Sequence, residues 1–178
     1  MIERPREGEF AEFYRGYVME VADADVISVL ERQQDELLRL AAEVSPERET
    51  HRYAPGKWSI REVVGHLTDG ERVFGYRAYC IARGEQGPLP GFDEDRYVAD
   101  GDSDRQPLLR LAEEFVAARA ANLTTFRRLD ETALARLGNA NGRPISVRAL
   151  AFIMAGHVRH HLEVVRERYR PLHKGESS

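Results

Sequence analysis

Two histidines lie within the apolar stripe of a long predicted helix near the end of the chain. The segment 146–169 repeats apolar residues at helical spacing and begins at Ser146, a favourable N-cap residue. At about 100° per residue, His161 falls about 40° from His157. The apolar residues around them on the wheel are Leu150, Ile153, Met154 and Val164. The chain must therefore fold so that this stripe, histidines included, faces a core.

An imidazole in a core needs partners for both ring nitrogens, because an unpaired buried polar group costs about 1–3 kcal/mol. His157 and His161 lie one helical turn apart, and this arrangement can chelate a divalent metal. The same pattern also fits two core histidines that are simply hydrogen-bonded. A third ligand from another part of the chain would favour the metal.

Three further helical patterns, together with the last one, predict an all-α fold, a four-helix bundle. They span about residues 25–44, 59–83 and 106–129. Asp23 or Asp25 is placed to cap the first of them. Ser59 and Glu62 fit a capping box at the start of the second, and Trp58 precedes the box where a hydrophobic staple would form.

The connecting segments carry weaker signals. The aromatic segment 10–21 is predicted to pack across one end of the bundle. The loop 89–97 is long, acidic and aromatic, so it is either a cover over a site, with Tyr97 as a lid, or a solvated connector. A short helical turn is expected at 131–135, and a hairpin-like turn at 138–142.

Composition is that of an ordinary soluble protein with one domain, 1–178, whose core spans about 13–170 and whose polar tail is 171–178. The net charge of −4 argues against a nucleic-acid partner. No apolar run approaches the roughly 20 residues of a membrane span, and no secretory signal is recognisable. The single cysteine, Cys80, excludes an internal disulfide, so we expect a cytoplasmic protein.

His66 is the candidate third ligand, at the edge of the apolar face of the second helical pattern. Glu62 and Asp69 flank it at positions i−4 and i+3, where either carboxylate could accept the free N–H of the imidazole. The alternative is a solvated margin with intrahelical pairing. Three histidines leave a divalent metal an open position, and their nitrogens suit Zn, Ni, Cu or Fe.

Other polar residues near the predicted centre have lesser roles. His160 lies about 60° from His157 on the helical wheel, which favours a place beside the ligands or at the rim. Arg77 lies on the polar stripe of His66 and is a candidate for substrate contact at the rim. The last helix also carries three basic residues predicted to be solvated, Arg148, Arg159 and Arg166.

Five segments stand out in a particular order. They are 53–66 (YAPGKWSIREVVGH), 71–72 (ER), 76–77 (YR), 90–95 (PGFDED) and 155–161 (AGHVRHH). Their order and spacing, over about residues 13–169, resemble the DinB-like superfamily, also called the DinB/YfiT-like metalloenzymes. The resemblance implies an up-down-down-up four-helix bundle, often a homodimer. It also implies a metal site at His66, His157 and His161, the residues that the helical wheels select.

The activities of this superfamily include thiol S-transfer with bacillithiol, mycothiol or glutathione, and a thiol-dependent maleylpyruvate isomerisation. Other members are known only as damage- or stress-induced proteins. The resemblance implies a thiol-dependent S-transferase or a hydrolase that acts on a small-molecule electrophile. The expected cofactors are a divalent metal, most readily Zn or Ni, and a low-molecular-weight thiol. The alternative is a non-catalytic metal-binding or stress-response interaction protein.

Overall fold

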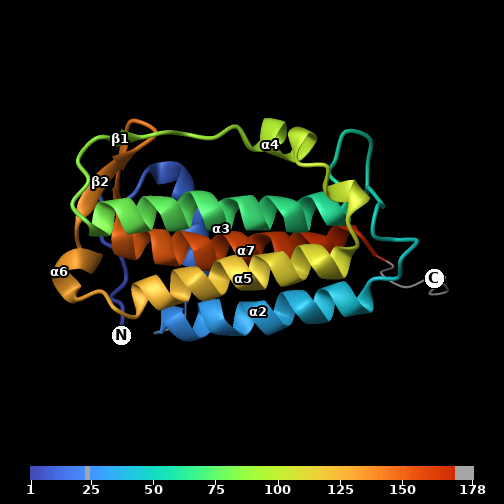
Figure 1. Ribbon diagram of the computed structural model, residues 1–178, viewed down its shortest axis with the longest axis horizontal. Coiled ribbons are helices and arrows are strands. Elements are labelled where there is room, and N and C mark those ends of the chain that lie inside the picture. The colour runs from blue at the N-terminus through green and yellow to red at the C-terminus, as the bar shows by residue number, and fades with distance from the viewer. Residues whose placement is uncertain (23–24, 171–178) are drawn as a thin grey trace.

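The computed structural model describes residues 1–22 and 25–170. Within this part of the chain, four long helices lie side by side (Figure 1). They are α2 (Val26–Glu43), α3 (Ile60–Ala82), α5 (Leu108–Phe126) and α7 (Val147–Arg168). In Figure 1, α2 and α7 run in one direction, and α3 and α5 run in the other. The predicted up-down-down-up bundle is therefore confirmed.

Side-chain caps fix where the helices begin. The Asp25 carboxylate accepts from the backbone N–H of Ile27 at the start of α2, whereas Asp23 and the tail 171–178 lie outside the described residues. Ser59 and Glu62 form the predicted capping box of α3, in which each side chain bonds the backbone N–H of the other. These caps satisfy N–H groups that the first turn of a helix leaves unpaired.

The parallel course of α3 and α5 requires a long return connection, because α5 must begin at the end of the bundle where α3 began. This connection contains β1 (Pro88–Leu89), α4 (Glu94–Asp100) and the 3-10 turn η2 (Ser103–Arg105). Figure 1 shows it running back along α3, with α4 above that helix. The segment expected to be a loop at 89–97 is therefore partly helical, and it is anchored on α3.

A small sheet closes one end of the bundle. After α6 (Glu131–Leu134), strands β2 (Leu137–Ala140) and β3 (Arg143–Ser146) form an antiparallel hairpin. Asn141 and Gly142 take positive φ values of 53° and 73° at its tip, as a tight hairpin turn requires. The predicted hairpin turn is thus confirmed. The parallel pairing of β1 with β2 was not predicted, because its partners lie far apart in the sequence.

The N-terminal aromatic segment lies along the side of α7, and not across the end of the bundle as predicted. It forms the 3-10 turn η1 (Glu12–Tyr14) and α1 (Arg15–Glu20), and α1 packs against α7. Gly156 permits this approach: a Cβ at that position would lie 2.0 Å from the carbonyl oxygen of Tyr17. Covered by α1, the first half of α7 is buried on all sides.

The apolar core consists of two clusters, one toward each end of the bundle. On α7, Ala155 is the last member of the first cluster and Val158 is the first member of the second. His157 therefore lies where the two clusters meet. Within the described residues, no helix combines the length and the apolarity that crossing a bilayer requires.

Candidate metal centre

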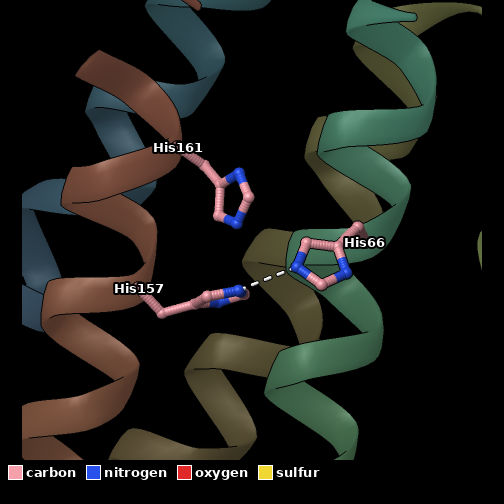
Figure 2. A group of neighbouring side chains, drawn as sticks. All are labelled: His66, His157 and His161. Atoms are coloured by element: carbon pink, nitrogen blue, oxygen red, sulfur yellow. Dashed lines mark hydrogen bonds between the residues drawn. The ribbon is translucent and has the colours of Figure 1, made fainter. Parts of the chain in front are cut away.

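Three imidazoles converge in the space between α3 and α7. Figure 2 shows His66 projecting from α3 toward His157 and His161, which lie one turn apart on α7. The Nε2 atoms of His66 and His157 share a hydrogen bond of 2.8 Å. The ring centroids of the three pairs lie 4.7–4.8 Å apart. The helical caps and the packing of the two helices thus bring together three residues that the helical wheels placed on inward faces.

Burial keeps all three imidazoles neutral. It lowers the pKa of His66 to about 4, against a smaller opposing effect of the Asp95 charge. Burial, with the neighbouring histidines, lowers the pKa of His161 to about 3 and that of His157 well below its ordinary value. At neutral pH each ring therefore has one nitrogen with a free lone pair, the form in which histidine binds metals.

The donor set and its spacing fit a divalent metal. One ligand atom from each histidine lies within 4.8 Å of the other two, and the shortest separation is 2.8 Å. Tetrahedral zinc holds imidazole nitrogens at about 2.0–2.1 Å, which places neighbouring ligand atoms about 3.3 Å apart, within that range. Among the described histidines, cysteines and acidic residues, these three form the group whose ligand atoms lie close enough together to hold a metal ion. Their role as metal ligands stays a prediction.

The carboxylates expected to orient His66 are engaged elsewhere. Glu62 accepts from Ser59 in the capping box and from the guanidinium of Arg52. Asp69 lies 3.9 Å from Arg72 and lines a groove on another face of α3. The Nδ1 atom of His66 is buried and has no hydrogen-bond partner within the described residues. The expected carboxylate–histidine pair is therefore wrong for both acidic residues.

A first cavity, of about 280 Å³, reaches the centre from the side of His161. We call it the Trp58 cavity. Its wall includes Tyr53, Lys57, Trp58, Asp95, His160, His161 and Tyr169. The Trp58 ring lies 4.7 Å from that of His66 and 6.3 Å from that of His161, so it covers both imidazoles.

A second cavity, of about 270 Å³, reaches the centre from the side of His157. We call it the Arg77 cavity. Its wall is mostly aromatic: Phe13, Tyr14, Tyr17, Phe74 and Phe92 line it with Arg77, Glu94, Asn141 and His157. Arg77, predicted at the rim, is instead buried at this cavity and donates to the carbonyl oxygen of Pro90 at 2.7 Å.

His160 and the return connection flank the centre. The His160 ring lies 5.2 Å from that of His161, and its Nδ1 lies 3.8 Å from the carboxylate of Glu20, at the mouth of the Trp58 cavity. Tyr97, expected as a lid, packs on Phe92 and lines the groove of Asp69 instead. From the same segment Asp95 faces the histidines, because positions 95 and 97 point to nearly opposite sides of α4.

A buried ion pair next to the centre had no sequence signal. The Arg119 guanidinium on α5 is fully buried and binds both oxygens of Glu71 on α3, at 2.7 and 2.8 Å. It also donates to the carbonyl of Leu30 and to Gln33 on α2, and Gln33 in turn donates to Ala155 on α7. The network thus joins all four long helices.

Known proteins share this architecture. YfiT from Bacillus subtilis, described as a probable metal-dependent hydrolase with an unusual four-helix bundle topology, has a TM-score of 0.73, 20% identity and 92% of each chain covered. The DinB-like protein YjoA from Bacillus subtilis has a TM-score of 0.60 and 22% identity, covering 86% of this chain and 94% of its own. At these identities the likeness shows the fold alone.

A mycothiol-dependent maleylpyruvate isomerase matches at a TM-score of 0.64 and 13% identity, over 78% of this chain and 58% of that one. No curated protein matches the sequence closely enough to count as a relative. The sequence profile of the DinB superfamily matches residues 29–165, which run from the first turn of α2 to the last turn of α7 and include all three histidines. The chain therefore belongs to the DinB superfamily.

Proposed function

We propose that this protein is a metal-dependent enzyme that transfers a small thiol to a small electrophile. The observation that carries the proposal is the convergence of three neutral imidazoles, two buried and one half-buried, on a point that two separate cavities reach. Three protein ligands, where a structural site commonly has four, leave a position open for a reactant. Two cavities suit a reaction with two organic reactants, which favours thiol transfer over hydrolysis, because water needs no cavity of this size.

Different residues of the chain would bind the metal and shield it from water. His66, His157 and His161 would hold the metal, which when bound stabilises a thiolate or hydroxide near neutral pH. Trp58 shields two of the ligands from water. In the overall reaction the thiol sulfur forms a bond to the electrophilic carbon. The leaving group departs with its electron pair, and the thiol proton passes to solvent.

The relatives support this class of reaction without fixing it. The mycothiol-dependent isomerase uses a thiol on a related bundle, and YfiT is described as a metal-dependent hydrolase. Hydrolysis, with water in the place of the thiol, is therefore the second candidate. A metal-binding protein without turnover is the alternative from another class.

The first experiment measures metal content by elemental mass spectrometry on protein purified without an affinity tag. We expect about one divalent ion per chain in the wild type and its loss in His66→Ala and His157→Ala. His51→Ala is the matched control, because that imidazole packs against Tyr169 outside the centre and its removal should leave the metal in place. Absence of metal in the wild type, even after incubation with Zn and Ni, would contradict the proposal.

The second experiment tests turnover on the metal-loaded protein. Bacillithiol, mycothiol or glutathione is mixed with 1-chloro-2,4-dinitrobenzene, and the products are identified by mass spectrometry. A thioether, formed with release of chloride and a proton, indicates thiol transfer, whereas 2,4-dinitrophenol indicates hydrolysis. Neither product above the His157→Ala background, across this and further electrophiles, would favour the non-catalytic alternative.

A further inference from the structure

Arg77 is a buried cation whose charge no carboxylate offsets within the described residues. Only 3% of the residue is exposed. It donates to the carbonyl of Pro90 and hydrogen-bonds the Tyr14 hydroxyl, and its Nε is buried with no partner among the residues that the structure describes. A buried charge without a counter-ion is costly, and an anion bound beside it would offset that cost.

The other buried arginines of the same chain show how this protein normally solves the problem. Arg119 binds both oxygens of Glu71 and donates its remaining N–H groups to a carbonyl and an amide. Arg148, predicted to be solvated, is instead buried and binds the carboxylates of Glu9 and Glu3. Arg77 alone among the three buried arginines of the described residues lacks a carboxylate partner.

The cavity beside Arg77 independently constrains what kind of ligand could bind there. Five aromatic rings line the cavity beside it, and its guanidinium carbon lies 5.8 Å from the centre of the Phe74 ring. The cavity has a volume of about 270 Å³, close to the lower end of the range for small-molecule sites, roughly 300–1,000 Å³. Aromatic walls favour an apolar or aromatic body, while the guanidinium, which has a free Nε–H and no carboxylate partner, can donate to a ligand carboxylate.

We propose that the Arg77 cavity binds a small carboxylate with an aromatic or apolar body, whose carboxylate pairs with Arg77. The binding site rests on Arg77 and on the aromatic wall of its cavity, and it needs no metal at the histidines. Its further role, seating the electrophile beside His157 while the Trp58 cavity takes the thiol, rests on the proposed function. The substrate class that follows is a small, flat organic acid.

Glu94 tunes this site from the mouth of the cavity. Its side chain is exposed and lines the same cavity, and no ion pair with Arg77 is formed within the described residues. Burial raises the pKa of Tyr14 and Tyr17, and the Glu94 charge adds a smaller upward effect on both, which Arg77 opposes at Tyr14. A carboxylate ligand would therefore be repelled by Glu94 while it is attracted by Arg77, and removal of the Glu94 charge should tighten binding.

The test measures binding of benzoate and of its neutral isostere benzamide to metal-free protein, by calorimetry and by chemical-shift changes in NMR spectra. In metal-free protein, benzoate cannot bind to a metal at the histidines, so any binding reflects the Arg77 cavity. A negative result would therefore overturn the Arg77 site without bearing on the proposed metal-dependent function. We expect benzoate to bind at millimolar concentrations or below, and benzamide to bind about 10–100-fold more weakly, the range for a hydrogen bond to a charged group.

Variants locate the site. Arg77→Gln should weaken benzoate by about 10–100-fold, and Glu94→Gln should strengthen it severalfold. Arg72→Gln is the matched control, since this exposed arginine on the same helix pairs with Glu114 and should not matter. Equal binding of benzoate and benzamide, no benzoate binding, or weaker binding in Glu94→Gln would each overturn the proposal. The ligand pair and Glu94→Gln keep it testable even where Arg77→Gln fails to fold.

Discussion

At the scale of single residues, Tyr169 holds the wall of the Trp58 cavity in place. Its hydroxyl donates to the carbonyl oxygen of Trp58 at 2.7 Å, and its side chain is almost fully buried. We expect Tyr169→Phe to lower the free energy of unfolding by about 1 kcal/mol at neutral pH, the usual value of such a hydrogen bond. Urea denaturation followed by circular dichroism measures the difference.

The same residue predicts a pH dependence. Burial raises the pKa of the Tyr169 phenol to about 12, from an ordinary value near 10. Because the unfolded phenol ionises first, the wild type should lose stability as the pH rises from about 10 to about 12. Tyr169→Phe should lack this contribution, so its deficit should shrink between pH 9 and pH 11. Tyr97→Phe, at a surface-exposed phenol, is the control, and an unchanged deficit would contradict the assignment.

The sequence predicted which histidines face inward, because helical periodicity alone determines which residues share a face. It did not predict what their neighbours do. Glu62 was expected to orient His66, yet the capping box and Arg52 use its carboxylate. The pairing of Arg119 with Glu71 and the approach of Asp95 to the centre depend on elements far apart in the chain. Local patterns contain no information on such contacts.

At the scale of elements, the close contact of α1 with α7 depends on Gly156. A methyl group there would meet the backbone of Tyr17, which cannot move aside as a flexible side chain could. We expect Gly156→Ala to lower the free energy of unfolding by about 1–3 kcal/mol, as overpacking does, despite the better helix propensity of alanine. Denaturant midpoints and the chemical shifts of Tyr17, whose ring packs on His157, report the change.

Gly16→Ala on α1 is the matched control. A Cβ at Gly16 meets nothing within 4 Å, so this variant should be neutral or more stable by up to about 1 kcal/mol. Equal effects of the two substitutions would show that helix propensity, and not the contact between helices, decides the outcome at position 156.

The bounds of the long helices were predictable because caps and apolar periodicity are local. The pattern at 59–83 corresponds to α3, and the pattern at 146–169 corresponds to α7 with its Ser146 cap. The placement of 10–21 was wrong because the sequence shows that the segment is apolar, but not which surface receives it. The helix α4 was missed because its seven residues are too few for a periodic signal.

At the scale of the whole molecule, the topology places the candidate centre. Because α3 and α5 run in the same direction, the return connection must cross the length of α3, and it carries Asp95 and Phe92 to the two cavities. The up-down-down-up directions of the helices followed from the family resemblance, whereas periodicity gave only their number and their ranges. Both cavities arise between segments distant in sequence, so neither could be predicted from local patterns.

The buried network of Arg119 and Glu71 links the four long helices by polar contacts. Replacing Arg119 by Met leaves the Glu71 carboxylate buried without a counter-charge, with only the Asn122 amide still donating to it, so we expect a loss of about 3–5 kcal/mol in unfolding free energy. Replacing Glu71 by Leu in the same chain removes the orphaned charge and should recover a large part of the loss. Urea unfolding of the two single variants and the double variant gives the coupling energy. Additive losses would mean that the two side chains act independently, whereas recovery would show that the loss in Arg119→Met comes from the orphaned Glu71 charge and that the pair itself adds little net stability.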